Sequence, residues 1–231
     1  MSTHDDEFNW RESLERLGSA ALDLVTGLGA RVSGEAQGPV GSGVVVTESR
    51  EVSGFTRIKL AGFGTLNITQ TGTESLSITA DDNILPHLTS EVVDGTLELG
   101  VKPRLSFRPM KHITYTVTVN SLDGIQLTGA GTVHASGIQT QSLSVMISGA
   151  GDMTISGSAP LQTVKISGAG NYDASELQTE SSEVTISGAG NARINASRTL
   201  NATVSGAGAV KYTGSPQVSQ RITGIGSVRA V

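Results

Sequence analysis

Apolar and polar residues alternate on both sides of a short glycine phrase that recurs through the second half of the chain. The first glycines of successive copies are separated by 20, 19, 20, 18 and 18 residues. A fixed period near 20 indicates a repeat array, in which each unit buries its apolar face only against its neighbours. The phrase is Ser-Gly-Ala-Gly at 148–151, 167–170, 187–190 and 205–208, Thr-Gly-Ala-Gly at 128–131 and Thr-Gly-Ile-Gly at 223–226.

Aligning the copies on the first glycine places apolar residues in columns. The positions two and four residues before this glycine are apolar in nearly every copy, as are those four and six after it, while the intervening positions are mostly polar. Alternation with period two on both sides of a glycine corner predicts two short strands per copy with one face inside. Two of the predicted inward columns are Leu127, Ile147, Ile166, Ile186, Val204 and Ile222, and Val133, Met153, Tyr172, Ala192, Val210 and Val228.

These columns predict an all-β chain that winds as a right-handed parallel β-helix, a β-solenoid, over residues 44–231. Residues 125–231 are expected to form regular rungs and residues 44–124 irregular ones. Apolar residues also flank Gly62 at the same four offsets, so this glycine marks a variant first copy. The 67 residues that separate Gly62 from Gly129 suit about three longer rungs, with room for some antiparallel pairing.

The glycines of the phrase are expected to form corners, where a positive φ or a close backbone approach excludes a Cβ atom. The small residue between them is expected to fill a tight inner corner, and the preceding Ser or Thr to cap corner amides. The predicted structural corner residues are Gly129, Gly131, Gly149, Gly151, Gly168, Gly170, Gly188, Gly190, Gly206, Gly208, Gly224 and Gly226.

Residues 1–33 follow a different pattern. Residues 1–7 are acidic and lack the basic start of a signal peptide. Between residues 8 and 28, apolar residues recur at spacings of three and four, which predicts a short amphipathic helix. This helix is expected to cap the solenoid or to dock on a membrane or a partner, and residues 34–43 to form a linker. Its apolar stripe is Trp10, Leu14, Leu17, Leu24 and Leu28.

The composition narrows the range of partners and chemistry. Only 3% of residues are aromatic, against 37% hydrophobic, which suits a thin solenoid core. A formal net charge of −5 argues against nucleic acid as a partner. The absence of cysteine excludes disulfides and thiol chemistry, and no apolar run reaches membrane-spanning length.

No catalytic residue, metal site or cofactor follows from the motifs. Each Gly-Ala-Gly lies between two predicted strands, whereas a phosphate-binding loop precedes a helix. Asp152 and Asp173 occupy outward positions on adjacent copies without a third carboxylate, so we expect solvated surface residues. Asn171 and Asn191 are expected to stack as a short ladder. A carbohydrate-active enzyme, which needs clustered carboxylates or a metal, is the less favoured class.

A basic segment surrounds an aromatic residue in the stretch between Glu98 and Asp123, which contains no acidic residue. On an acidic protein, such a loop is a candidate contact for an anionic surface or glycan. The simpler interpretation is a solvated loop that connects two strands. The residues of this candidate patch are Lys102, Arg104, Phe107, Arg108 and Lys111.

Further segments carry a family resemblance: GFTRI at 54–58, DNILPHL at 82–88, DGTLEL at 94–99, YTVTV at 115–119 and SLD at 121–123. Together with the Gly-Ala-Gly series they resemble the putative auto-transporter adhesin, head GIN domain family, over roughly residues 43–231. The resemblance implies a right-handed β-helix of unknown function in bacteria, usually exported to the cell envelope or surface, with no established catalytic residues. Because no signal peptide is evident, a cytoplasmic location is the alternative.

We therefore expect a non-enzymatic adhesion or scaffold module. The expected partners are a second copy of the chain, another envelope protein or a glycan, and not nucleic acid. The alternative is a self-assembling or membrane-associated scaffold. In that case the N-terminal helix docks on a partner or membrane, and the last rung, at residues 228–231, pairs with another chain.

Overall fold

The computed structural model describes residues 40–103 and 112–231. The chain divides into two units, Met1–Gln37 and Gly38–Val231, and all described residues belong to the second. The predicted amphipathic helix with its stripe Trp10 to Leu28 lies outside the described residues. So do four residues of the predicted basic patch, Arg104, Phe107, Arg108 and Lys111.

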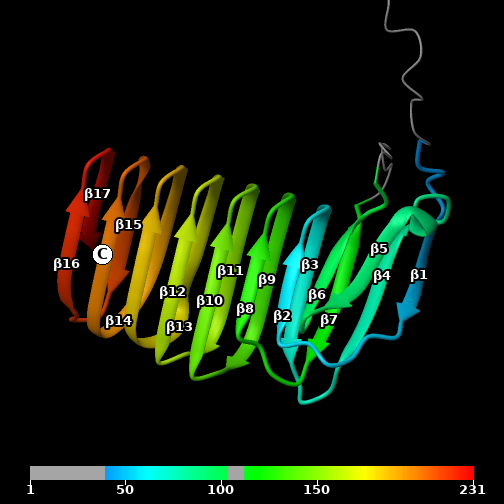
Figure 1. Ribbon diagram of the computed structural model, residues 1–231, viewed down its shortest axis with the longest axis horizontal. Helices are drawn as coiled ribbons and strands as arrows, with labels where there is room; N and C mark the ends of the chain where they lie inside the picture. Colours follow the sequence, from blue (N-terminus) through cyan, green and yellow to red (C-terminus); the bar gives the residue numbers. More distant parts are fainter. Residues whose placement is uncertain (1–39, 104–111) are drawn as a thin grey trace, which may run out of the picture. The chain divides into compact units, whose positions relative to one another are not determined.

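The second unit is a β-solenoid, in which each rung has two strands that meet at a glycine corner (Figure 1). Equivalent strands of consecutive rungs pair in parallel and in the predicted register, so that Ile166 lies opposite Ile147 on one side and Ile186 on the other. The strands of the regular part are β8 (Gly124–Leu127), β9 (Ala130–Gln139), β10 (Ser142–Ile147), β11 (Ala150–Ser158), β12 (Leu161–Ile166), β13 (Ala169–Ile186), β14 (Ala189–Val204), β15 (Ala207–Thr213), β16 (Gln217–Ile222) and β17 (Ile225–Ala230).

The predicted inward columns form the core of the regular rungs except at the last rung, where Ile222 is 40% exposed. Ile147, Ile166 and Ile186 are at most 1% exposed, as is Tyr172 in the column after the corner. Burial of an aliphatic side chain of this size contributes roughly 1.5–3 kcal/mol. The columns therefore supply the driving force for stacking one rung on the next.

The corners are tight because the main chains of successive rungs touch there. A Cβ atom on Gly149 would lie 1.8 Å from the carbonyl oxygen of Gly129, and on Gly168 it would lie 2.0 Å from that of Gly149. The other glycines of the two predicted columns, 129 to 224 and 131 to 226, meet the preceding rung in the same way. Space for a neighbouring backbone, more than a positive φ, therefore requires glycine at these corners.

Two expectations about the corners are wrong. The alanine between the glycines does not fill an inner corner, because Ala150 and Ala169 are exposed. Corner amides are also satisfied by backbone oxygens of the preceding rung, and not by the Ser or Thr hydroxyl. The amide of Ala150, for example, donates to the carbonyl of Gly129 at 3.0 Å. Main-chain stacking between glycines leaves no inner space for the alanine methyl.

The order of rungs in space differs from their order in the chain near the start of the solenoid. Strands β2 (Arg57–Leu60) and β3 (Phe63–Gln70) pair in parallel with β8 and β9, which places Ile58 opposite Ile125. This confirms the register predicted for Gly62. On their other side, β2 and β3 pair in parallel with β6 (Thr96–Val101) and β7 (Thr114–Val119). The rung formed by β2 and β3 is thus enclosed between two later rungs.

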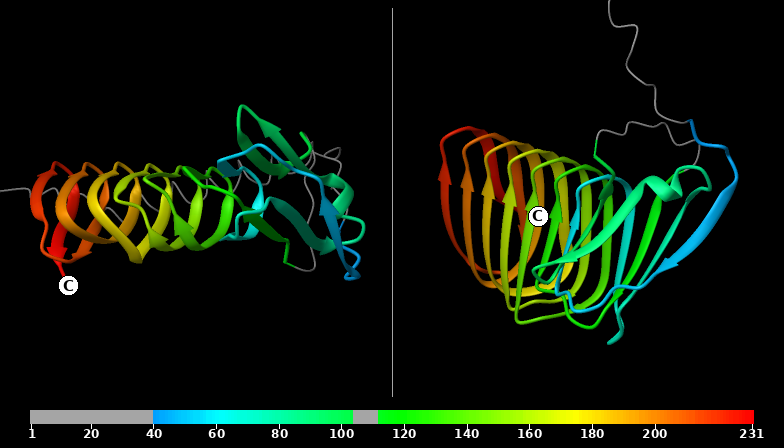
Figure 2. Two further views of the ribbon diagram at one scale, coloured as in Figure 1. Left: turned by 90° about the horizontal axis from the view of Figure 1, so that it is seen from below. Right: turned by 45° about the vertical axis from the view of Figure 1, so that its right-hand side comes forward.

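The prediction of about three rungs between Gly62 and Gly129 is wrong. Apart from β3 and β8, which belong to the rungs at Gly62 and Gly129, only β6 and β7 of the described part of this segment join the parallel stack. The remainder forms antiparallel strands over the end of the solenoid (Figure 2). β4 (Ser75–Asp81) pairs with β7, β1 (Val45–Arg50) pairs with β4, and β5 (Leu88–Val93) pairs with β6, after the 3₁₀ turn η1 (Leu85–His87). The expected antiparallel pairing is confirmed, and it supplies a cap at this end.

Candidate functional site

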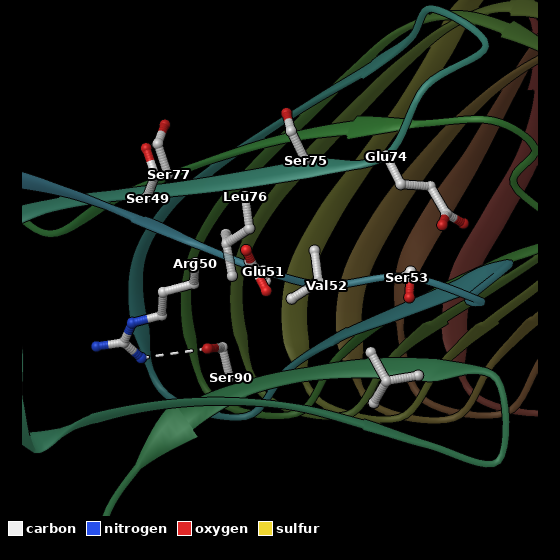
Figure 3. Close-up of a pocket in the computed structure, with 11 residues that line it drawn as sticks. Ser49, Arg50, Glu51, Val52, Ser53, Glu74, Ser75, Leu76, Ser77 and Ser90 are labelled. Carbon is white, nitrogen blue, oxygen red and sulfur yellow. Dashed lines mark hydrogen bonds between the residues drawn. The ribbon is translucent and has the colours of Figure 1, made fainter.

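A groove of about 800 Å³ lies in the cap, where β1 diverges from β4 and faces β5 (Figure 3). The groove exists because β1 pairs with β4 only as far as Arg50, opposite Leu76, so the chain from 51 to 53 continues without a strand partner in β4. Five of its 11 lining residues are serines, and Glu51 and Glu74 add an acidic residue from each side. The lining residues are 49–53, 74–77, Ser90 and Val92.

Arg50 connects the two walls of this groove. Its guanidinium donates to the backbone oxygens of Leu88 at 2.8 Å and Leu85 at 3.1 Å. It also donates to the hydroxyl of Ser90 at 3.2 Å (Figure 3). The Nε atom also donates to Glu48 at 2.8 Å. With its donors engaged and its side chain only 17% exposed, Arg50 fastens β5 to β1.

The acidic residue on the opposite wall is also structural. The carboxylate of Glu74 accepts hydrogen bonds from the backbone amides of Gly54 at 2.8 Å and Phe55 at 3.4 Å. It therefore holds the chain that enters β2. The groove retains serine hydroxyls and the exposed Glu51 for contact with solvent or a ligand.

A second polar region lies on the outer face of the regular rungs, where amide side chains form a ladder along the solenoid. Asn171 donates to Asp152 at 2.8 Å, and Asn191 donates to Asn171 at 3.0 Å. The oxygen of Asn191 in turn accepts from the backbone amide of Ala209 at 3.1 Å. The predicted Asn171–Asn191 ladder is confirmed, and it extends by one rung on each side.

Asp173 does not join Asp152 in a carboxylate pair. Asp152 lies opposite Asn171, whereas Asp173 lies between Thr154 and Arg193. Partial burial acts to raise the pKa of Asp173. Two hydrogen bonds from Ser175 and the positive charge of Arg193 outweigh this effect, so the pKa is lowered from its ordinary value. A carboxylate held in its ionised form by fixed neighbours is unsuited to act as a general acid.

A hollow of about 360 Å³ adjoins the ladder on the same face. It lies where Ala209 presents a methyl group in the column that carries Asn171 and Asn191 on earlier rungs. Its walls include Arg193, Lys211 and Arg229, which occupy one column of the repeat. Arg193 and Lys211 occupy intervening, mostly polar positions of the repeat, for which the sequence alone predicts no site. The shared offset of the three cations from the corner glycine is the signal that identifies them.

Two buried tyrosines differ in how their hydroxyl groups are satisfied. Tyr172 accepts a hydrogen bond from the buried Gln162 at 2.5 Å, and Gln162 accepts from Ser182 at 3.2 Å. The hydroxyl of Tyr115 has no hydrogen-bond partner among the residues that the structure describes. Burial raises the pKa of both phenols, that of Tyr115 to about 12. Neither tyrosine reaches the surface, so both belong to the core.

Of the predicted basic patch, the structure describes only Lys102. Lys102 of the basic patch is exposed, and its amide donates to the backbone oxygen of His87 at 3.0 Å. Within 40–103 and 112–231, no three His, Asp or Glu side chains are arranged to hold a metal ion. No helix in the same residues is long and apolar enough to cross a membrane.

The family described as "Putative auto-transporter adhesin, head GIN domain" matches residues 54–216. The chain belongs to this family. Its function is unknown, and no enzymatic family is indicated. None of the curated proteins matches the chain.

Solved structures of several bacterial proteins match most of this chain. A putative adhesin from Bacteroides fragilis NCTC 9343 is 27% identical, with a TM-score of 0.70, and the match covers 83% of this chain and 99% of that one. A putative adhesin from Parabacteroides merdae ATCC 43184 is 20% identical, with a TM-score of 0.47 over 84% and 99% of the two chains. A putative lipid binding protein from Parabacteroides distasonis ATCC 8503 is 23% identical, with a TM-score of 0.49 over 83% and 98%.

Proposed function

We propose that this GIN domain is a non-enzymatic adhesion or scaffold module that presents fixed rows of side chains to an extended ligand. The observation that carries the proposal is the ladder from Asp152 through Asn171 and Asn191 to the amide of Ala209. Its side chains are held at strand spacing, about 4.8 Å, by hydrogen bonds along the solenoid. A surface fixed in this way binds a repeating ligand with little loss of side-chain entropy.

The family relationship supports this role. The Bacteroides fragilis protein is described as a putative adhesin and is similar over almost its entire length. We further propose that the solenoid winds in the right-handed sense, which parallel crossovers favour. The amphipathic helix over residues 8–28, and a contact of that helix with a partner or membrane, also remain predictions.

Adhesion is tested by coupling the full chain to beads and measuring their retention on surfaces coated with envelope polysaccharides or envelope proteins. Beads that carry the folded chain should be retained on at least one coating, and beads with heat-unfolded chain should not. The same polysaccharides should keep their length during incubation. Shortened chains would indicate an enzyme, and equal retention of the two bead preparations would refute adhesion.

Self-assembly is the second candidate, and the last described rung favours it. Strands β16 and β17 pair with β14 and β15 on one side only, and Ile225 is 87% exposed. Unpaired strand edges with apolar side chains are sites for pairing with another chain. Sedimentation of the full chain should then show a dimer that Ile225→Glu dissociates. A monomer at all concentrations would exclude this candidate.

A further inference from the structure

Three cations occupy the same outward position on consecutive rungs of the solenoid. Arg193 of β14 lies opposite Lys211 of β15, which lies opposite Arg229 of β17. Strand spacing separates their backbones by about 4.8 Å. Like charges at directly opposed positions repel, so the column does not stabilise the fold by its own contacts. An anion placed over the column would remove this repulsion.

The protein neutralises only one end of the column. The carboxylate of Asp173, on the rung before Arg193, forms an ion pair with that guanidinium at 3.5 Å. Within 40–103 and 112–231, neither Lys211 nor Arg229 has an acidic partner within ion-pair distance. The column therefore carries an excess of two positive charges, although the whole chain has a formal net charge of −5.

The surroundings of the column suit an oxygen-rich ligand. Ala209 leaves a hollow beside the cations, and Asn191 lies at its edge. On the other side of the column, Asn195 of β14 lies opposite Thr213 of β15, so both flanks offer amide or hydroxyl groups. These groups are able to bind the hydroxyls of a sugar while the cations bind its acidic group.

We propose that this face binds a linear anionic polysaccharide that lies along the solenoid, with its carboxylate or sulfate groups over Arg193, Lys211 and Arg229. The proposal rests on the proposed adhesive function and names its ligand class. A polysaccharide fits better than single-stranded nucleic acid, which requires aromatic side chains on which bases stack. The outward positions of β15 and β17 carry no aromatic residue.

Binding is tested with the full chain at low salt, using immobilised polygalacturonate for carboxylates, dextran sulfate for sulfates and neutral dextran as the uncharged control. The unmodified chain should bind at least one anionic polymer and not dextran. The double variant Lys211→Gln/Arg229→Gln should bind about tenfold or more weakly, because both unneutralised cations are lost. The double variant Lys165→Gln/Arg221→Gln removes the same charge from exposed positions on β12 and β16 and should bind within about twofold of the original.

A gain of affinity separates the proposal from simple misfolding. Asp173→Asn removes the carboxylate that competes for Arg193, so this variant should bind the same polymer about two- to fivefold more tightly. Raising the salt concentration should weaken binding of the original chain more steeply than that of Lys211→Gln/Arg229→Gln, because fewer ion contacts remain in the double variant.

Several outcomes would overturn the proposal. One is an equal loss of affinity in the two double variants, which would mean that net charge and not this column controls binding. Another is the absence of binding to both anionic polymers. Preferential binding of polydeoxythymidine or polyglutamate would assign the face to a different ligand class. Bead retention on neutral glycan or protein coatings with no binding to polyanions would refute this site and leave the adhesive function standing.

Discussion

The regular rungs (β8 to β17) and the cap end of the unit (β1 to β7) share the same inward columns. They differ in how their strands find their partners. In the regular part, each strand pairs with its equivalent about one period away, as β12 does with β10 and β13. In the cap end, the decisive partners lie much farther apart in the chain, such as Arg50 with Leu88 and Gln70 with Gln139. Repetition therefore encodes the first region, whereas individual long-range contacts encode the second. Such contacts cost more loop-closure entropy before they form.

The largest expected effect is at a corner of the regular rungs. Gly168→Val should lower the free energy of unfolding by more than about 3 kcal/mol or prevent folding, because its Cβ atom overlaps backbone that is unable to move aside. The oxygens of Gly149 and Ser148 would lie 2.0 Å and 2.5 Å from that atom. Urea unfolding followed by circular dichroism measures the change.

Gly72, in the cap end, is the matched contrast to Gly168 because its surroundings are open. At Gly72 a Cβ atom would meet nothing within 4 Å, and only the φ of +83° favours glycine. Gly72→Ala should therefore cost about 1 kcal/mol, the penalty of a left-handed conformation. Thr185→Val, on the outer side of a regular rung, should change stability by no more than about 0.5 kcal/mol. Similar losses for Gly168→Val and Thr185→Val would contradict the inside–outside assignment.

The next largest effect is expected in the cap. Arg50→Met keeps the length of the side chain but removes its bonds to Leu85, Leu88 and Ser90, which should cost about 2–3 kcal/mol. Hydrogen exchange should accelerate in β5 and η1 and remain unchanged in β12. The matched control is Arg198→Met. This change breaks an exposed pair with Glu180 and should cost less than about 1 kcal/mol. Faster exchange in β12 to the same degree would show that the cap and the rungs unfold as one unit.

The two regions also differ in how much of them the sequence reveals. The inward columns around Ile147 and the variant copy at Gly62 could be predicted, because period-two alternation about a corner leaves one arrangement that buries every apolar residue. The placement of β6 and β7 outside β2 and β3 could not be predicted. Their apolar pattern is the same as that of a rung that follows in chain order, and only the pairing partner differs.

The candidate sites are harder to predict than the fold, because they also depend on which strands pair. The cation column combines residues that are unremarkable singly, and the effect of Ala209 depends on the longer side chains beside it. The cap groove follows from the divergence of β1 from β4 after Arg50, which no local pattern marks. Outward positions carry little constraint from packing, so their chemistry becomes visible only when the register is known.

A further difference between the two regions concerns their buried tyrosines, Tyr172 in the regular rungs and Tyr115 in β7. Tyr172→Phe should cost about 1–3 kcal/mol, because it leaves the amide of the buried Gln162 without its acceptor. Tyr115→Phe should be neutral or slightly stabilising, since no described residue bonds to its hydroxyl group. Chemical unfolding of both variants at pH 7 measures the difference. An equal cost for the two substitutions would contradict the structure, in which the hydroxyl of Tyr172 is hydrogen-bonded and that of Tyr115 has no described partner.

The pH dependence of the same variants gives a second readout. The pKa of Tyr115 is raised to about 12 in the folded chain, whereas the unfolded phenol titrates near 10. The folded state therefore retains a proton that the unfolded state loses between these values. The stability due to the neutral phenol is complete below pH 10 and is lost as the pH rises toward 12, with a slope of less than about 1.4 kcal/mol per pH unit. Between pH 10 and 11, Tyr115→Phe should lose about 1 kcal/mol less stability than the unmodified chain. Parallel curves for the two proteins would mean that the phenol ionises as readily in the folded chain as in the unfolded one.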